Sequence, residues 1–414
     1  MLARLALHSL INRKGSVMLS LAAMTVSVFV LLGVEHIRHQ TKENFSSTVS
    51  GVDLIVGART GSLNLLLYSV FRIGSPTNNI RWETYENIAS DNNVKWAIPI
   101  SLGDSHRGYR VLGTTKDYFK HFSYGKKNRL ALASGREFDQ LFDVVLGAEV
   151  ARKLSYQLGD KVALAHGIGA TSFSNHDDKP FTVVGILAAT GTPVDQTLHV
   201  SLQGIEAIHI DWQQGVKVSR SNLTVEQLQQ ANLQPKSITA FMLGLNSRMA
   251  TFKVQRSINA YAQEPVVAIL PGVALSELWQ MIGLLENTLL LVSALIFVAA
   301  CLGVSAMLLA SIRERRREIQ LLRIIGAPAH FLFLLIELEA LLITMLSCVL
   351  GAGLLASCLM IFRDYLIGQF GLHIEVNLLT GQSLLLIGII LLASIIVAVI
   401  PSLSGFRKAK SIWA

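Results

Sequence analysis

Long apolar runs concentrate near the two ends of this 414-residue chain. A helix needs roughly 20 residues to cross a bilayer, and slightly shorter runs suffice where flanking side chains reach the interface. Four runs meet this length, at residues 18–34, 289–312, 331–361 and 383–401. The pattern predicts four transmembrane helices, with a long and more polar segment between the first and the second.

That intervening segment alternates strand-like and helix-like patterns. Short alternating or apolar runs bounded by turn residues predict strands, and amphipathic runs predict helices. The expected strands are 52–56, 109–113, 144–147, 161–164, 181–187, 240–245 and 266–270, and the expected helices are 81–92, 148–158, 202–211 and 247–263. The fold class is therefore an α-helical membrane protein with a large α+β extracytoplasmic domain, in two lobes, inserted between helices 1 and 2.

The last helix of this segment has no obvious end. From Ala274 to Arg317 the only residues that disfavour a helix are Gly283 and Gly303. We therefore expect one helix to run from the external domain through the membrane. At 1.5 Å per residue, about 44 residues would span roughly 65 Å.

Basic residues outside the intervening segment mark the topology. Of twelve Lys and Arg there, only Arg363 falls in the loop between the third and fourth helices. The other eleven flank the opposite ends of the helices: Arg4, Arg13, Lys14, Arg313, Arg315, Arg316, Arg317, Arg323, Arg407, Lys408 and Lys410. The positive-inside rule places both termini in the cytoplasm. The net charge of +8 then reflects topology, so no nucleic-acid partner is expected.

The first apolar run is expected to be an uncleaved signal anchor, because Gly33 and Val34 are followed by Glu35 and His36 rather than by a cleavage site. The predicted order is an interfacial helix (1–15), the first span (16–36), the external domain (37–275), a stalk and second span (276–312), a cytoplasmic helix (313–328), the third span (329–361), a short periplasmic loop (362–382), the fourth span (383–403) and a cytoplasmic tail (404–414).

Residues 313–328, R-E-R-R-R-E-I-Q-L-L-R-I-I-G-A-P, combine dense positive charge with an apolar stripe; we call them the basic segment. Ile319, Leu322 and Ile325 recur at helical spacing. Gly326 and Pro328 supply the end of the helix. This pattern indicates an amphipathic helix on which another protein docks. The spacing alone equally allows a charge cluster that only holds the loop in the cytoplasm.

Motifs of soluble catalysis are missing from the sequence. It contains no G-x-x-x-x-G-K-[ST] phosphate loop, no G-x-S-x-G nucleophile turn and no H-E-x-x-H metal helix. We therefore predict that this chain is not an enzyme and binds no cofactor itself.

Histidines and aspartates in the external domain could supply metal ligands, since imidazole and carboxylate suit transition metals. The candidates are His166, His176, Asp177, Asp178, His199 and His209. Their spacing matches no standard site. The favoured interpretation is that they are solvated loop residues, and no metal site is predicted.

Two acidic residues, Glu337 and Glu339, fall near the cytoplasmic start of the third apolar run. A charge costs less there than at the bilayer centre, and an arginine of the preceding loop could pair with it. A proton relay would need partners deeper in the membrane, which the other spans lack. Structural ion pairing is the favoured interpretation.

Several motifs together indicate a family. The basic segment matches E-R-R-x-E-I-x-x-L-[RK]-x-[IL]-G-A, and P-S-L-S-G-F-R-K-A at residues 401–409 is similar to a C-terminal P-x-x-x-A-x-R motif, though without its usual alanine. The external domain contributes S-G-R-E-F from Ser134, V-V-L-G-A-E-V-A-R-K-L from Val144, L-G-D-K-V from Leu158 and F-T-V-V-G-I-L-A-A-T-G-T-P-V-D from Phe181. With these motifs and its helix order, the whole chain resembles the MacB/LolE/FtsX class of ABC transporter permeases.

The resemblance implies a permease that works as a dimer with two separate ATPase subunits, in which ATP and Mg²⁺ are bound. The second permease is either another copy or a homologue. The resemblance also implies a coupling role for Arg315, Arg316, Glu318, Ile319, Leu322, Arg323 and Gly326. Such permeases move an external domain to drive export, handle lipoproteins or activate a hydrolase, so an adaptor, a lipoprotein or a hydrolase is the expected periplasmic partner, beside membrane lipid.

The chain departs from MacB in lacking a fused N-terminal ATPase, and from division-type FtsX in its larger external domain. One alternative from another class is a membrane receptor whose external domain senses a ligand and whose basic segment recruits a signalling protein. A channel or secondary transporter is disfavoured, because the spans carry almost no buried charge and no inverted repeat. The expected location is the bacterial inner membrane.

Overall fold

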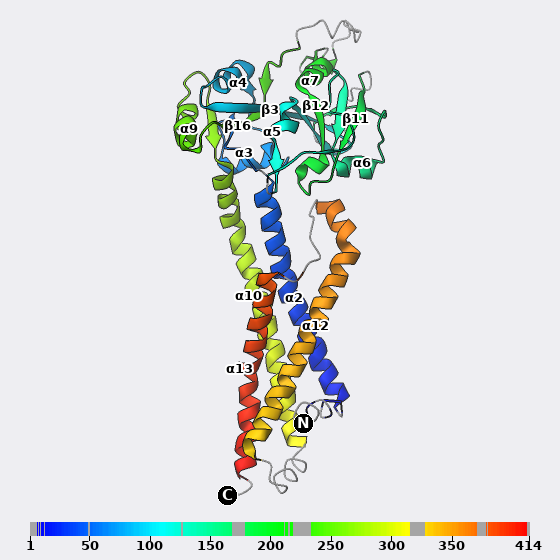
Figure 1. The fold of residues 1–414 in the computed structure, drawn as a ribbon, viewed down its shortest axis with the longest axis vertical. Helices are drawn as coiled ribbons and strands as arrows, with labels where there is room; N and C mark the ends of the chain where they lie inside the picture. The colour runs from blue at the N-terminus through cyan, green and yellow to red at the C-terminus, as the bar shows by residue number, and fades with distance from the viewer. Residues whose placement is uncertain are drawn as a thin grey trace. The chain divides into compact units, whose positions relative to one another are not determined.

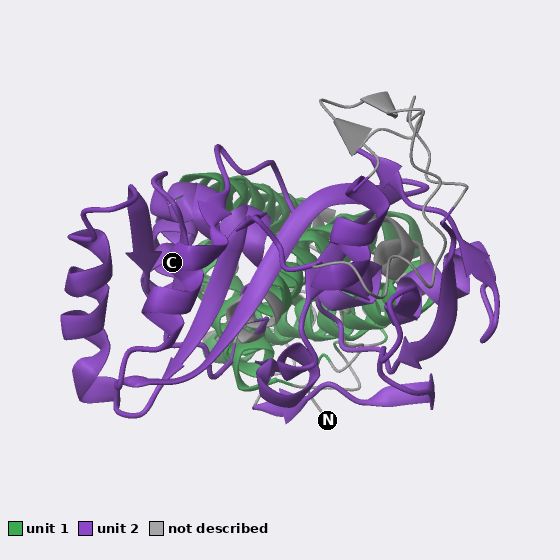
Figure 2. Ribbon diagram, turned by 90° about the horizontal axis from the view of Figure 1, so that it is seen from above, with its two compact units in different colours: residues 1–41, 282–365, 374–414 green, residues 42–281, 366–373 purple. Residues whose placement is uncertain are grey.

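A computed structural model describes residues 6, 8, 10–11, 13–48, 50–125, 127–167, 179–210, 212–213, 216–217, 233–314, 328–370, 378 and 380–411. It divides into two compact units (Figures 1 and 2). The membrane unit comprises Met1–Thr41, Ile282–Tyr365 and Ile374–Ala414, and the external domain comprises Lys42–Met281 with Leu366–His373.

Four long helices build the membrane unit: α2 (Lys14–Ser47), α10 (Pro271–Glu314), α12 (Ala329–Phe370) and α13 (Gly381–Ser411). Each contains a stretch long and apolar enough to cross a membrane, which confirms the four predicted spans for the described residues. The predicted unbroken helix from Ala274 is likewise observed, as far as Glu314. The helix α2 continues beyond residue 36, the predicted end of the first span. There Arg38 pairs at 2.8 Å with Glu35, which lies three residues earlier on the same face of the helix.

Small residues let the membrane helices approach one another. A Cβ added at Gly351 of α12 would lie 3.0 Å from Val28 Cγ1 and 3.2 Å from the Thr25 carbonyl oxygen of α2. Such close backbone approach is typical of helix pairs in membranes. Between α12 and α13, the hydroxyls of Thr344 and Ser394 lie 2.6 Å apart, so a hydrogen bond joins these helices where both residues are buried.

One mixed sheet forms the centre of the external domain. Its strand order is β17-β1-β16-β3-β4-β12-β8-β11-β7, with β10 paired to β3 and β9 to β11. The strands are β1 (Leu54–Ala58), β2 (Ile80–Arg81), β3 (Val94–His106), β4 (Tyr109–Thr114), β5 (Ser123–Tyr124), β6 (Asn128–Arg129), β7 (Leu132–Gly135), β8 (Asp143–Leu146), β9 (Lys161–Val162), β10 (Ala165–His166), β11 (Phe181–Leu187), β12 (Thr197–Ser201), β13 (Trp212–Gln213), β14 (Val216–Lys217), β15 (Ser237–Ile238), β16 (Ala240–Leu245) and β17 (Val266–Ile269). The long β3 pairs with β16 through its first half and with β4 through its second, and so joins two half-sheets.

Short helices cover the two half-sheets. They are α3 (Ser62–Ser69), α4 (Trp82–Ala89), α5 (Asp117–His121), α6 (Ala148–Leu154), α7 (Leu202–His209) and α9 (Thr251–Asn259), with 3-10 turns η1 (Pro193–Gln196) and η2 (Arg248–Ala250). In Figure 1, α4 and α9 lie with β16 and β3, and α6 and α7 lie with β11 and β12. The strands β1, β8 and β16 are buried along their whole length, as expected for strands covered on both faces.

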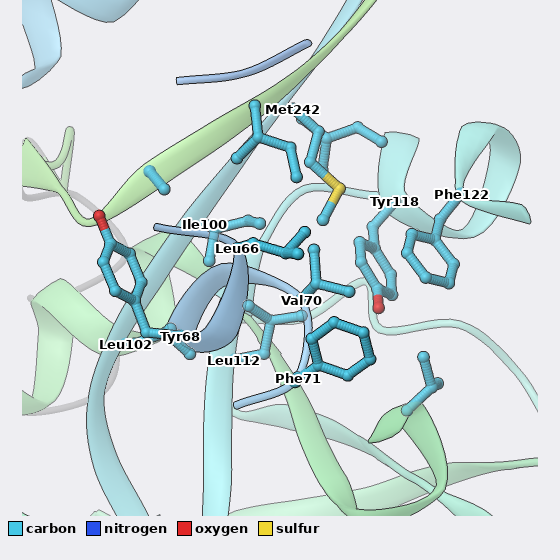
Figure 3. Packing of buried hydrophobic residues seen from close by; sticks show 14 of the residues in the cluster. Leu66, Tyr68, Val70, Phe71, Ile100, Leu102, Leu112, Tyr118, Phe122 and Met242 are labelled. Atoms are coloured by element: carbon cyan, nitrogen blue, oxygen red, sulfur yellow. The ribbon is translucent and has the colours of Figure 1, made fainter. Parts of the chain in front are cut away.

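The central core fills the space where the half-sheets join. Figure 3 shows part of it, with Ile100 of β3 beside Leu66 of α3 and Leu102 of β3 beside Tyr68 of α3. Tyr118 stacks on Phe122 with ring centroids 4.9 Å apart. Ala274 and Leu275, from the first turns of α10, belong to the same cluster. The start of α10 is therefore part of the folded core of the external domain.

Close packing of the backbone explains why glycine occurs in two of the external-domain motifs. A Cβ at Gly185 in β11 would lie 2.2 Å from the Arg136 carbonyl oxygen, and one at Gly135 would lie 2.1 Å from the Val184 carbonyl oxygen. Gly135 also has φ +81, which favours glycine. The S-G-R-E-F and F-T-V-V-G-I-L motifs therefore interlock, because only glycine fits at both positions.

Two buried carboxylates hold neighbouring turns. Asp195 accepts hydrogen bonds from the backbone N–H groups of Thr190 and Gly191 at 2.9 and 2.8 Å. Asp143 accepts from the Gln140 backbone at 2.9 Å and forms an ion pair with Arg136 at 2.7 Å. A buried carboxylate needs such donors. These motif residues thus stabilise the architecture of the external domain.

Candidate functional site

The predicted coupling residues Arg315, Arg316, Glu318, Ile319, Leu322, Arg323 and Gly326 all lie outside the described residues. The structure does describe both attachment points of the basic segment. Ile312 near the end of α10 and Ile336 and Ala340 near the start of α12 belong to one buried cluster, together with Leu10 and Ala398. The two ends of the basic segment are thus fixed to the packed core of the membrane unit.

An ion pair lies in the same region. Arg13 Nη2 donates to Glu339 Oε2 at 3.1 Å, and the Glu339 side chain is 2% exposed. The predicted partner, an arginine of the basic segment, belongs to side chains outside the described residues; the partner among the described residues is Arg13, which precedes α2. The Arg13 signal was available in the sequence as a basic residue at the same predicted membrane boundary.

Glu337 and Glu339 are two residues apart on α12, so their side chains project in different directions. Both carboxylate oxygens of Glu337 are buried, and the polar group that interacts with them among the described residues is the Ser402 hydroxyl of α13. Within that part of the chain, therefore, Glu339 is paired with Arg13 and Glu337 has no ion-pair partner.

At the end of the spans opposite Arg13 and Glu339, charged side chains of α2 and α10 lie close together. Arg38 of α2 pairs with Glu35 at 2.8 Å and lies 3.8 Å from Glu286 of α10. All three side chains are at most one-third exposed. This contact links the two helices that connect the membrane unit to the external domain in the sequence.

The external domain has a polar cleft of about 680 Å³. Trp82 of α4, Thr114 of β4 and Gln203 of α7 contribute to its lining. Lys116 and Asp139 form an ion pair on its wall, and the hydrogen bond and charge of Lys116 lower the pKa of Asp139. The cleft therefore offers aromatic, hydroxyl, amide and charged groups to a polar surface.

The histidines separate into two environments. His166 and His209 meet at the carboxylate of Asp104, a residue that the sequence did not single out. His176, Asp177 and Asp178 lie outside the described residues. His199 is elsewhere, fully buried in β12, with ring centroids 5.4 Å from Tyr118 and 6.0 Å from Phe119.

The environment of His199 makes the external domain acid-sensitive. Burial, reinforced by the charge of Arg72, lowers the pKa of His199 to about 3. The unfolded chain, with a pKa near 6.5, takes up a proton that the folded chain excludes, so stability is complete above pH 6.5 and falls as the pH decreases toward 3. At pH 5 the expected loss is about 2 kcal/mol.

Thermal unfolding of the purified full chain at pH 7.5 and pH 5 measures this loss. His199→Phe keeps an aromatic ring beside Tyr118 and Phe119 and removes the titrating group. The variant should lose less stability than wild type between the two pH values. Equal losses in both proteins would assign the acid sensitivity to other groups.

The architecture defines a multi-pass membrane protein with a large α+β domain between its first two spans. Residues 17–260 match the family model of the MacB-like periplasmic core domain. Residues 290–411 match the FtsX-like permease C-terminal model. The chain therefore belongs to the MacB/FtsX family of ABC transporter permeases, which are transporter subunits that work with ABC ATPase partners in the inner membrane.

Two solved structures show likeness to this chain. The periplasmic region of MacB from Actinobacillus actinomycetemcomitans is 10% identical, with a TM-score of 0.34, over 56% of this chain and 94% of that one. The extracellular domain of the noncanonic ABC-type transporter YknZ from Gram-positive bacteria is 11% identical, with a TM-score of 0.30, over 53% of this chain and 98% of that one. No curated protein matches the chain.

Proposed function

We propose that this permease relays the ATP-driven dimerisation of a separate ATPase to its own external domain. The observation that carries the proposal is the unbroken helix α10, from Pro271 to Glu314. Its first turns contribute Ala274 and Leu275 to the external core, and its last turn contributes Ile312 to the membrane core. A continuous helix with both ends packed in this way has no break at which a displacement along its axis would be lost.

The basic segment is the proposed docking site for the ATPase. An amphipathic helix docks in a groove through its apolar stripe, while its charges set register. Here Ile319, Leu322 and Ile325 form the stripe, and arginines surround it. The fixed ends at Ile312 and Ile336 would pass a displacement of this segment to α10 and α12.

The complex that fits this role holds two ATPase copies, which bind ATP and Mg²⁺, and two permeases. Both termini and the basic segment would face the cytoplasm, following the distribution of lysine and arginine. The external domain would then act on an export partner, a lipoprotein or a cell-wall hydrolase. The polar cleft beside Trp82 and Gln203 is the surface of the external domain that we propose for such a partner.

A charge placed in the stripe tests the docking role. Leu322→Asp is expected to weaken recovery of the ATPase with the tagged permease by at least about 30-fold, because loss of an apolar anchor and burial of a charge each cost binding energy. Gln320→Asp adds the same charge on another face of the predicted helix and should retain the ATPase. Mass spectrometry of the co-purified proteins and ATP hydrolysis by the complex provide the readouts.

Full ATPase recovery and stimulated hydrolysis with Leu322→Asp would contradict the proposal, provided that both variants insert equally in the membrane. If the wild-type chain retains no Walker-type ATPase even after crosslinking, the alternative that this chain is a membrane receptor replaces the proposed relay.

A further inference from the structure

Three elements of the external domain converge on one carboxylate oxygen. Asp104 lies on β3, His166 on β10, and His209 is the last residue of α7. His166 Nδ1 lies 3.1 Å from Asp104 Oδ1, and His209 Nε2 lies 3.3 Å from the same oxygen. Asp104 and His166 are cross-strand partners, so the sheet itself sets their separation.

The backbone of β3 is irregular at this point. Leu102 pairs with Leu112 and Ser105 with Arg110, so two residues of β3, Gly103 and Asp104, oppose one residue of β4. This is a β-bulge, a feature that re-aims a side chain and recurs beside functional sites. The Gly167 backbone N–H, immediately after His166, donates to the Gly103 carbonyl oxygen at 3.0 Å and fixes β10 against the bulge.

The carboxylate is buried and the histidines are accessible. Asp104 is 2% exposed, whereas the His166 and His209 side chains are 31% and 30% exposed. A buried carboxylate therefore lies at the base of a site whose two imidazoles reach solvent.

The arrangement of the histidines favours a shared cation over a simple ion pair. The two rings stack with centroids 4.6 Å apart and an interplanar angle of 15°. Two imidazole nitrogens and one carboxylate oxygen that lie this close together form a donor set for a divalent cation.

The distances also match metal coordination. Zinc binds histidine nitrogen and carboxylate oxygen at about 2.0–2.2 Å, so ligand atoms in a tetrahedral site lie about 3.3–3.5 Å apart. The two measured N···O distances, 3.1 and 3.3 Å, are close to this edge length. All three ligand atoms lie within 4.8 Å of one another. The three ligands found among the described residues leave a fourth coordination position, which water or another group would fill.

We propose that Asp104, His166 and His209 form a binding site for a divalent first-row transition-metal ion, of which Zn²⁺ is the best fit. Imidazole suits zinc, copper, iron and nickel, and the carboxylate completes a two-histidine, one-carboxylate set. Bound metal joins β3, β10 and α7. This site is independent of the proposed ATPase coupling, because its residues lie in the external domain and the coupling residues lie in the basic segment.

Metal titration of the full chain tests the site. The chain is purified in detergent with an affinity tag that contains no histidine, stripped with a chelator, and titrated with Zn²⁺ by calorimetry and with Co²⁺ by visible absorption. One equivalent should bind, and Co²⁺ should give the intense d–d absorption of a tetrahedral site. His166→Ala and His209→Ala should each weaken Zn²⁺ binding at least about 100-fold, since loss of even an outer partner of a ligand costs 10–100-fold.

Two further variants separate ligand loss from misfolding. His121→Ala removes a partly buried imidazole of the same domain that stacks on Trp96, and should bind Zn²⁺ as wild type does. His209→Cys replaces one zinc ligand by another, and should restore one-equivalent binding with a new thiolate-to-cobalt charge-transfer band. Absence of stoichiometric binding in wild type, or unchanged affinity in His166→Ala and His209→Ala, would overturn the proposal.

Discussion

Replacing Gly283 by proline is expected to abolish transmission of the nucleotide state to the external domain. Gly283 lies inside α10, between the turns that pack in the external core and the span that follows. Proline in a helix interior removes a backbone hydrogen bond, clashes with the preceding turn and costs about 3 kcal/mol. If α10 acts as the proposed relay, a kink at this point would absorb the displacement.

The matched control is alanine at the same position. A Cβ at Gly283 would meet no atom within 4 Å, so Gly283→Ala adds no clash and should stabilise the helix by about 1 kcal/mol. Hydrogen exchange of external-domain peptides, with and without ATP and vanadate, measures the response in the reconstituted complex. Wild type and Gly283→Ala should respond to nucleotide, and Gly283→Pro should not. An equal response in all three proteins would exclude α10 as the relay.

Replacing Gly185 by alanine is expected to prevent normal packing of the external domain. The added Cβ would lie 2.2 Å from the Arg136 carbonyl oxygen, a backbone atom that cannot move without disturbing the β7–β11 pairing. Overpacking of this kind costs about 3 kcal/mol or more, which would lower the unfolding midpoint by about 6–12 °C in a domain of this size.

Gly272→Ala is the matched control, because it makes the same chemical change in α10 with no atom within 4 Å of the new Cβ. Thermal unfolding of both purified variants, together with their resistance to trypsin in membranes, provides the comparison. A Gly185→Ala protein as stable as the control would mean that β7 and β11 can separate at little cost.

Periodic patterns in the sequence predicted most of the elements. The strands β11 and β16 were expected at 181–187 and 240–245 and occur at those residues, because their apolar residues are bounded by clear turn signals. The longest strand, β3, was not expected. Pro99, Gly103 and Asp104 interrupt its pattern, and each disfavours a strand interior. Pro99 lies in the half of β3 that pairs with β16, before the pairing with β4 begins at Ser101. Only one edge of the strand has a partner strand there, so the missing N–H of proline is tolerated.

The Asp104 cluster could be anticipated only in part. His166 and His209 were considered as metal ligands because imidazole suits transition metals, but their separation in sequence matched no standard site. Asp104 gave no local signal, since it lies about sixty residues before His166 in the unpredicted strand. Their proximity depends on the antiparallel β3–β10 pairing and on the β-bulge, and both are tertiary features.

The shared strand β3 also determines how the external domain responds to force. Its thirteen residues form hydrogen bonds with β16 at one end and with β4 at the other, so both half-sheets are built on a single piece of backbone. Rotation of one half-sheet against the other would bend this strand and disturb the central core, which takes side chains from both half-sheets. A displacement of one half-sheet is therefore expected to reach the other through β3 and the core that they share.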